Sequence, residues 1–335
     1  MDLNNQLKEC EESPLKYHLS LKEELIDQAY VLASNDADKV DPLKIYFNKY
    51  LGGGSFNSLY VGKFNKKLVA VKQMRLIPIE REIIQQKMQI YMRLEHENVV
   101  KLWDVSFSHD RYTRLILDLC TADMEDFCEQ KYIGPMPPDD KVFLQTVSGV
   151  EYIHSQNLLH RDIKPTNVLV SSSSPVHIKV SEVTWQPKKI SDIFNQSECK
   201  PLPYWMATES LEQLQLGCEP DETIATDIFS TGCVLFYFLT RGTHPFGNSP
   251  IWLSVNIVEH NPVELIKLNK NNLNDCDRIL YGLIEEMIGR EENRIGLSEV
   301  KKQLTDMLSA KLTCDSSEPD KITEVENVVG QQDLK

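Results

Sequence analysis

The chain has 335 residues, of which 41% are apolar and 26% are charged, enough to bury the core of one large domain or two ordinary ones. Its net charge of −14 argues against a nucleic-acid-binding protein, because contacts to phosphates need clustered lysine and arginine. No stretch approaches the roughly 18 apolar residues of a membrane-spanning helix, and the N-terminus lacks the features of a secretory signal. We therefore expect a cytoplasmic protein, with no membrane and no nucleic acid among its partners.

Residues 1–42 form a polar N-terminal flank with one amphipathic stretch, Leu19 to Leu32, in which apolar residues recur at helical spacing. The flank is not expected to be a catalytic unit. The sequence leaves open whether its helix packs on the rest of the protein or binds another protein.

The central segment, residues 43–310, is predicted to form one domain of two unequal parts. Short alternating runs broken by glycines predict β-strands in residues 43–118, with one helical pattern after Pro78. Longer apolar segments with helical periodicity, such as Val142 to His154, dominate residues 121–310. The predicted fold class is α+β, with a small N-terminal β-sheet lobe that contains one helix and a larger, mainly α-helical C-terminal lobe.

The C-terminal segment, residues 311–335, is acidic and poor in aromatic residues, and we expect it to be disordered. The eight cysteines are scattered over the whole chain without a Cys-x-x-Cys pair or the spacing of metal ligands. They are expected to be reduced thiols, most of them buried.

A glycine-rich turn, Gly52-Gly53-Gly54, lies between two strand-like runs near the start of the domain. Without side chains in the way, its backbone N–H groups can approach the phosphates of a nucleotide. The turn alone fits a plain hairpin as well, and Asn57 replaces the third glycine of a G-x-G-x-x-G pattern.

Lys72 ends the apolar run Val69-Ala70-Val71, a short distance after the glycine turn. A lysine inside a buried strand needs an anionic partner, whereas a lysine on an exposed edge strand does not. The order of the two elements, a glycine turn followed by a strand with a lysine, favours a nucleotide site.

The segment from His160 to Asn167 combines three groups that phosphoryl transfer requires. Asp162 can accept or orient the hydroxyl proton of an acceptor. Lys164 can neutralise charge that develops on the transferred phosphoryl group, and the side-chain oxygen of Asn167 can bind Mg²⁺, a hard cation that prefers oxygen ligands. With the glycine turn and Lys72 upstream, this set predicts a site that moves the terminal phosphoryl group of ATP.

From about Ile45 to Leu308 the sequence resembles the eukaryotic protein kinases, and it is similar in particular to the kinase module of the inositol-requiring unfolded-protein-response sensors. The runs that carry this similarity are Asp118 to Ala122 with Glu129 to Lys131, Asp227 to Cys233, and Gly242 to Gly247. The resemblance implies the bilobal protein-kinase fold, with ATP bound between the lobes and Mg²⁺, or alternatively Mn²⁺, as the metal ion.

The resemblance also implies roles for single residues. Lys72 would hold the α- and β-phosphates, Leu117 would be the gatekeeper, and Asp118 to Cys120 would form the hinge between the lobes. Glu209, in the run Ala207-Thr208-Glu209, would pair with Arg294, and Asp227 would anchor the catalytic loop. The catalytic set would be Lys72, Asp162, Lys164 and Asn167, the metal ligands Asn167 and Glu182, and the residues at the nucleotide Leu51, Gly52, Gly53, Gly54, Ser55, Leu59, Ala70, Lys72, Leu117, Asp118, Cys120 and Leu169.

Three departures from the family pattern affect this machinery. Glu182 stands where the family has the magnesium-binding aspartate, so the carboxylate is retained but lies about one carbon–carbon bond further from the backbone. The helix glutamate that should pair with Lys72 is replaced by Lys87, unless the helix shifts by more than a turn so that Glu82 reaches in. Leu202 stands where the family has a threonine that bridges the catalytic aspartate and lysine.

Three functional hypotheses follow from this pattern. The first, which we favour, is a serine/threonine kinase with reduced activity that acts on an unidentified protein substrate. The second is a nucleotide-binding pseudokinase that acts as a scaffold. The third is a regulatory partner that forms a homodimer, or a heterodimer with a related sensor kinase. The sensors also carry a membrane span and a ribonuclease domain, and we expect neither in this chain.

Overall fold

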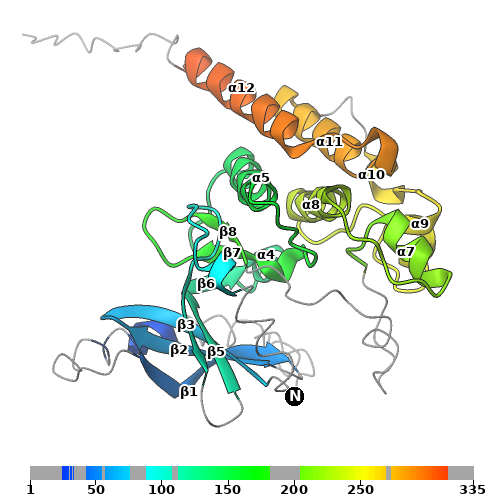
Figure 1. The fold of residues 1–335 in the computed structure, drawn as a ribbon. Helices are drawn as coiled ribbons and strands as arrows, with labels where there is room; N and C mark the ends of the chain where they lie inside the picture. Colours follow the sequence, from blue (N-terminus) through cyan, green and yellow to red (C-terminus); the bar gives the residue numbers. More distant parts are fainter. Residues whose placement is uncertain are drawn as a thin grey trace, which may run out of the picture.

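The computed structural model describes residues 25–29, 31, 33, 43–54, 57–75, 88–107, 112–181, 204–268 and 273–315. A five-stranded antiparallel sheet forms a smaller lobe, and helices with a three-stranded sheet form a larger lobe (Figure 1). This is the bilobal α+β architecture that the sequence predicted.

The five-stranded sheet has the order β1-β2-β3-β5-β4. Because successive side chains of a strand point to opposite faces, β3 contributes to two apolar clusters. Val69 and Val71 form a small cluster with Ile116 on one face, whereas Ala70 belongs to the main core. The strands are β1 (Leu43–Gly54), β2 (Asn57–Phe64), β3 (Lys67–Arg75), β4 (Leu102–Phe107) and β5 (Tyr112–Asp118).

The N-terminal flank contributes a helical segment, of which residues 25–29, 31 and 33 are described, and this segment packs on the small lobe. Ile26 and Ala29 are buried in the main core. Lys63 Nζ on β2 donates to the backbone oxygen of Ala33 at 2.5 Å, and Lys49 on β1 donates to the side chain of Gln28. The question that the sequence left open is therefore answered for these residues, because they complete the small lobe.

A second sheet lies where the chain passes between the lobes. β5 ends at Asp118, and after Leu119 the chain enters β6 (Cys120–Asp123), which pairs with β7 (Val168–Ser171) and then β8 (Ile178–Val180). The backbone N–H of Val100 donates to the oxygen of Val180 at 2.8 Å, so the segment that leads into β4 also pairs with β8. The two lobes are thus joined by backbone hydrogen bonds as well as by the covalent chain.

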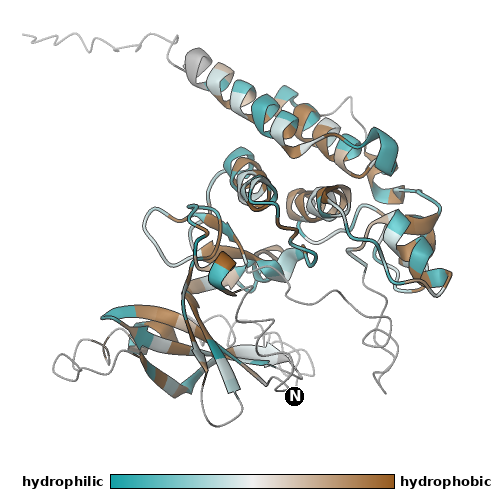
Figure 2. Cartoon of the chain, in the orientation of Figure 1, coloured by the Kyte–Doolittle hydropathy of each residue, from teal (hydrophilic) through white to brown (hydrophobic). Residues whose placement is uncertain are grey.

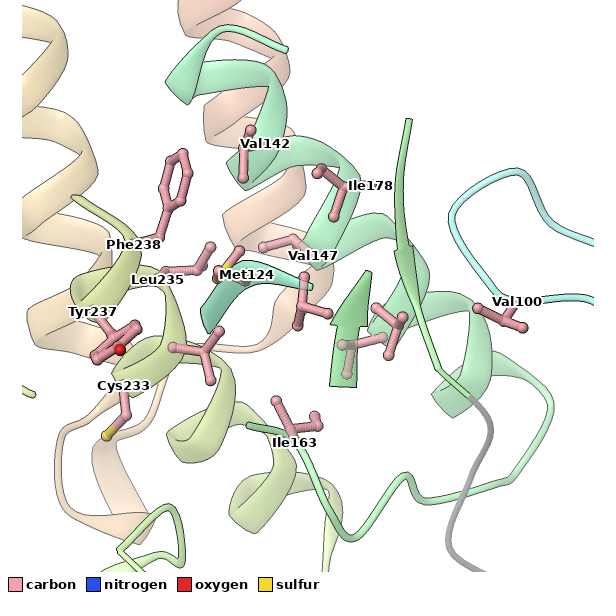
Figure 3. Packing of buried hydrophobic residues seen from close by; sticks show 14 of the residues in the cluster. Val100, Met124, Val142, Val147, Ile163, Ile178, Cys233, Leu235, Tyr237 and Phe238 are labelled. Atoms are coloured by element: carbon pink, nitrogen blue, oxygen red, sulfur yellow. The ribbon is translucent and has the colours of Figure 1, made fainter. Parts of the chain in front are cut away.

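Helices α5 (Asp139–Ser155) and α8 (Ile224–Leu239) form the centre of the large lobe. α8 is apolar along most of its length, the pattern of a helix buried on all sides (Figure 2). Leu235 and Phe238 of α8 lie in the core beside Val142 and Val147 of α5 (Figure 3). The other helices described in the large lobe are α4 (Met124–Cys128), η2 (Pro165–Asn167), α7 (Thr208–Gln215), α9 (Leu253–Val258), α10 (Val263–Lys267), α11 (Asp275–Met287), η4 (Glu291–Asn293) and α12 (Leu297–Asp315).

Two expectations from the sequence need correction. The disordered tail was predicted to begin at residue 311, but α12 continues to Asp315, and Lys311 Nζ pairs with the buried Asp140 of α5 at 2.8 Å. This ion pair and the packing of α12 on α5 extend the helix; residues 316–335 lie outside the described residues. Most cysteines were expected to be buried, whereas among the five described free thiols only Cys128 and Cys233 are.

The helices that the structure describes are all too short or too polar to span a lipid bilayer.

Candidate functional site

The catalytic loop, defined here as His160 to Asn167, brings three of the predicted catalytic side chains together. The Asp162 carboxylate oxygen Oδ2 lies 2.9 Å from Lys164 Nζ and 2.9 Å from Asn167 Nδ2. Asn167 Nδ2 also donates to the backbone oxygen of Asp162 at 2.7 Å. The Asp162 carboxylate is therefore fixed between an ammonium and an amide, and it remains partly exposed to solvent.

Asp227, the predicted anchor, holds this loop from the buried side. Its carboxylate accepts the backbone N–H groups of His160 at 2.7 Å and Arg161 at 2.9 Å, and a ring nitrogen of His154 lies 3.0 Å from it. Asp227 lies in the first turn of α8, where the N-cap Thr223 forms a capping box that fixes the start of the helix. The position of Asp162 is thus set by a helix about 65 residues further along the chain.

Arg161, next to Asp162, adopts a φ of 67° in the left-handed region, which is unfavourable for a residue with a Cβ. The two backbone bonds to Asp227 around this residue stabilise the turn. Arg161 Nε also lies 3.3 Å from Oε2 of Glu222, a largely buried carboxylate just before α8. The sequence did not predict the contact of Glu222 with Arg161, because the two residues are far apart along the chain.

Asn167 has the chemistry expected of a magnesium ligand. Both of its amide hydrogens are directed at Asp162, so its carbonyl oxygen is the atom that can bind a hard cation. Its backbone oxygen accepts the N–H of Ser181 at 2.9 Å, which ties the end of β8 to the loop. The second predicted ligand, Glu182, lies outside the described residues.

The glycine turn forms part of a long hairpin of β1 and β2. A Cβ at Gly53 would lie 2.4 Å from the backbone oxygen of Asn57 on the opposite strand, and Gly52 has a φ of 144° that side chains rarely adopt. Gly53 is therefore required because the opposite backbone lies so close, and Gly52 because of its backbone conformation. Lys72 follows on β3, opposite Leu59 of β2 and Leu115 of β5, and is half-buried.

Six apolar residues predicted to line the nucleotide site belong to one cluster, although they come from both sheets. Ala70 and Leu117 are buried and pair directly across β3 and β5. The other four are only partly buried and pack against this core. They are Leu51, Leu59, Cys120 and Leu169.

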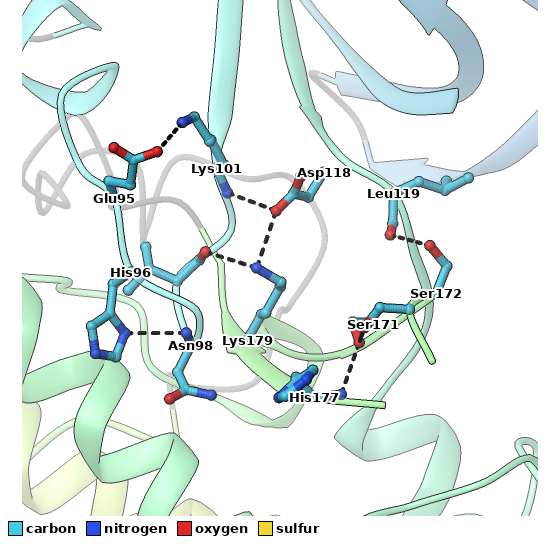
Figure 4. Close-up of polar contacts among 12 residues, drawn as sticks. Glu95, His96, Asn98, Lys101, Asp118, Leu119, Ser171, Ser172, His177 and Lys179 are labelled. Carbon is cyan, nitrogen blue, oxygen red and sulfur yellow. Dashed lines mark hydrogen bonds and ion pairs between the residues drawn. The ribbon is translucent and has the colours of Figure 1, made fainter. Parts of the chain in front are cut away.

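The hinge aspartate has a more extensive role than the sequence predicted. Asp118 Oδ1 accepts the indole N–H of Trp103 at 2.9 Å, and Oδ2 lies 3.1 Å from Lys179 Nζ (Figure 4 shows the lysine contact). Burial alone raises the pKa of Asp118, but the Lys179 ammonium and the hydrogen bonds outweigh it, so the pKa lies below its ordinary value. Neither Lys179 nor Trp103 was predicted as a site residue.

The structural pair Glu209 and Arg294 is confirmed. Arg294 Nη1 and Nη2 lie 2.7 and 3.2 Å from the two carboxylate oxygens of Glu209, a bidentate arrangement, and the Arg294 side chain is almost fully buried. This pair links α7 to the segment before α12. Several residues that the sequence singled out lie outside the described residues, namely Ser55, Glu82, Lys87, Glu182 and Leu202.

Comparison with known sequences gives consistent matches. The profile of the protein kinase domain matches residues 46–305. The "Sensor for unfolded proteins in the ER ire1" of Schizosaccharomyces pombe is 26% identical over 317 residues, covering 84% of this chain and 28% of that protein. The human "Serine/threonine-protein kinase/endoribonuclease IRE2" is 31% identical over 251 residues, covering 70% and 26%. "Serine/threonine-protein kinase 36" of Pongo abelii is 30% identical over 227 residues, covering 66% and 16%.

The chain spans about a quarter of the length of the first two of these relatives. The matches confirm the similarity that the three sequence runs suggested.

Proposed function

Because the chain belongs to the protein kinase family, we propose that it is an ATP-dependent protein serine/threonine kinase with reduced activity. It would transfer the γ-phosphate of ATP to a serine or threonine hydroxyl of a protein substrate. The observation that supports this best is the Asp162 carboxylate, fixed 2.9 Å from both Lys164 Nζ and Asn167 Nδ2 on a loop anchored by Asp227.

Each of these residues has a defined task in the proposed reaction. ATP with its bound metal ion supplies the phosphoryl group and neutralises part of its charge. Asp162 orients the acceptor hydroxyl and accepts its proton, and the adjacent Lys164 ammonium stabilises negative charge on the phosphoryl oxygens. Asn167 keeps its carbonyl oxygen for the metal because both amide hydrogens bind Asp162.

The expected activity is low because three positions depart from the family pattern. Glu182, Lys87 and Leu202 each replace a residue that positions the metal ion, the strand lysine or the catalytic pair. Losing one transition-state contact typically costs about 10²- to 10³-fold in rate. Two such imperfect contacts, at Glu182 for the metal ion and at Lys87 for the strand lysine, leave a slow kinase, since the total lowering of the reaction barrier by enzymes is much larger.

The same three substitutions support an alternative, a nucleotide-binding pseudokinase that acts as a scaffold or as a regulatory partner of a related sensor kinase. In that case Asp162 would have no chemical task. The substitution Asp162→Asn would then leave any cellular effect of the protein unchanged, whereas the kinase proposal requires that the effect is lost.

A transfer assay with labelled ATP tests the proposal. We expect slow incorporation of phosphate into serine or threonine, of the protein itself or of a generic substrate, with Mg²⁺ or Mn²⁺. Asp162→Asn should lower the rate at least 100-fold because it removes the proton acceptor, whereas Asp306→Asn, on the exposed face of α12, should not change it. No transfer by folded wild-type protein with either metal would contradict the proposal.

A further inference from the structure

The carboxylate of Asp118 is the centre of a polar cluster between the lobes, which we call the hinge cluster: Lys67, Lys101, Trp103, Asp118 and Lys179. The residues that contact this carboxylate come from three segments: the start of β3, the stretch from Lys101 to Trp103 that begins β4, and β8. Lys179 Nζ on β8 lies 3.1 Å from Oδ2, and the backbone N–H of Lys101 donates to the same oxygen at 3.2 Å (Figure 4). The indole N–H of Trp103 on β4 donates to Oδ1 at 2.9 Å, and Lys67 Nζ at the start of β3 lies 3.5 Å from that oxygen.

The centre of this cluster is shielded from water. The side chains of Asp118 and Lys179 are 13% and 16% exposed, and Lys179 Nζ also donates to the backbone oxygen of Val99 at 3.3 Å. The ammonium of Lys67 lies 4.1 Å from the centroid of the Trp103 ring, which closes the cluster from outside. A pair with this degree of burial differs from a surface ion pair, because removing one partner leaves the other charge desolvated.

The contacts join the lobes at the point where the chain crosses between them. Trp103 and Lys67 belong to the five-stranded sheet, whereas Lys179 belongs to the three-stranded sheet of the large lobe. Asp118 itself is the last residue of β5, one residue before β6 begins. The side chain of Asp118 therefore binds both lobes at once.

The Asp118 side chain lies on the opposite side of β5 from the apolar residues predicted at the nucleotide. Side chains alternate along a strand, so Asp118 points away from the face on which its neighbour Leu117 joins Ala70, Leu51 and Leu59 in the main core. The Asp118 side chain thus fixes the backbone of the hinge from behind, while Lys179 reaches it from β8, where it lies opposite Leu169 of the apolar lining on β7.

We propose that Asp118 and Lys179 are positioning residues, which clamp the hinge backbone in the geometry that accepts the base of a nucleotide. This inference rests on the proposed nucleotide site. The pair sets the distance between β5 and β8, and with it the spacing between the apolar residues that each lobe contributes. Loss of the clamp lowers nucleotide affinity and leaves the Asp162 site intact, so the KM for ATP rises while kcat changes less than twofold.

Three variants test the clamp: Asp118→Asn, Lys179→Met and the double variant. Each single substitution leaves a desolvated charge and should lower the melting temperature by several degrees, whereas the double substitution removes both charges and should recover most of that loss. The matched control is Glu151→Gln with Lys301→Met, an ion pair of 2.8 Å between α5 and α12 that lies within the large lobe.

Nucleotide affinity is measured by titration with ADP, and hydrogen exchange is followed in a peptide that covers residues 118–120. We expect ADP to bind at least fivefold more weakly to each single variant than to the wild type. The double variant should show the same loss of ADP affinity, although its melting temperature recovers. Exchange at the hinge should be faster in all three, and the control pair should bind ADP with wild-type affinity.

Unchanged ADP affinity in both single variants would overturn the clamp. So would full recovery of affinity in the double variant, because the pair would then serve stability alone. If the wild-type protein binds no nucleotide, the proposed function fails, but the clamp can still be tested by hydrogen exchange at the hinge. Exchange rates in Lys179→Met equal to those of the wild type would then contradict the clamp.

Discussion

Asp227 illustrates how one buried carboxylate controls the site at the scale of a single residue. It accepts backbone bonds from His160 and Arg161 and contacts His154, while its own side chain is almost fully buried. Asp227→Asn replaces one accepting oxygen with an amide donor that faces the backbone N–H of either His160 or Arg161. We expect it to lower the free energy of unfolding by about 3 kcal/mol and to reduce phosphoryl transfer strongly.

Urea denaturation and the transfer assay check this prediction together. Asp306→Asn is the matched control, because that carboxylate lies on the exposed face of α12. Surface substitutions typically change the free energy of unfolding by about 0.5 kcal/mol or less. If Asp227→Asn changes it by no more than that, the loop does not depend on this anchor.

His244 gives the stability of the protein a specific pH dependence. Burial lowers the pKa of this histidine to about 3. The unfolded chain therefore binds more protons than the folded protein below the ordinary histidine pKa, so the stabilisation is complete above about pH 6.5 and is lost as the pH falls towards 3. We expect a loss of about 2 kcal/mol between pH 6.5 and pH 5 from this residue.

The measurement is the difference in unfolding free energy between wild type and His244→Gln across that range. Taking the difference removes the contributions of His96 and His260, whose pKa values are also lowered by burial. Parallel pH curves for the two proteins would contradict the assignment.

At the residue scale the sequence predicted the side chains that meet in the loop from His160 to Asn167 and their anchor Asp227, but not Glu222, Lys179 or Trp103. Asp162, Lys164 and Asn167 could be named because they stand in one short motif, and Asp227 because the run Asp227 to Cys233 resembles the protein kinases. Lys179 could also have been found, since it lies between the buried Ile178 and Val180 and so needs an anionic partner, by the reasoning that singled out Lys72. Nothing in the sequence singled out Trp103, because its hydrogen bond to Asp118 depends on the pairing of β4 with β5.

At the scale of elements, the N-terminal helical segment behaves as part of the small lobe. Ile26 is 4% exposed and packs in the main core, whereas Val31 of the same segment is 63% exposed. Ile26→Ala should therefore cost about 2–5 kcal/mol of unfolding free energy, and Val31→Ala should change it by less than about 0.5 kcal/mol. Thermal unfolding of the two variants checks this, and equal effects would show that the segment does not dock as described.

The hairpin of β1 and β2 makes a second prediction at this scale. Gly53→Ala places a Cβ 2.4 Å from the backbone oxygen of Asn57, so the hairpin must distort and the affinity for ATP should fall. Gly282→Ala, within α11, meets no atom within 4 Å and should instead stabilise the protein by about 0.5–1 kcal/mol. Nucleotide titration and thermal unfolding of both variants test the contrast, which would be refuted if Gly53→Ala bound ATP with wild-type affinity.

Element types followed from the sequence more readily than element ends. The apolar periodicity of the segment from Val142 to His154 identified α5, and the glycine turn identified the hairpin, because both patterns are local. The end of α12 was placed too early, since an ion pair of Lys311 with Asp140, which is far away in sequence, stabilises its last turns. Long-range contacts of this kind leave no local pattern.

At the scale of the whole molecule, the proposed function depends on two lobes that contribute different groups. The small lobe supplies the glycine hairpin and Lys72, and the large lobe supplies Asp162, Lys164 and Asn167. The sequence predicted this division, because the order of motifs along the chain reflects the order of the lobes. It could not predict how the lobes are held together, since the hinge cluster joins residues that are separated by up to 112 positions, from Lys67 to Lys179.

The proposed kinase requires that the site between the lobes binds ATP together with a divalent cation, to which Asn167 would contribute an oxygen. A thermal-shift titration of the full chain with ATP, in the presence and in the absence of Mg²⁺, tests it most directly. We expect ATP with Mg²⁺ to raise the melting temperature in proportion to ligand occupancy, and ATP without the metal to raise it clearly less. A melting temperature that ATP does not change, with or without Mg²⁺, would show that this protein has no nucleotide site between its lobes.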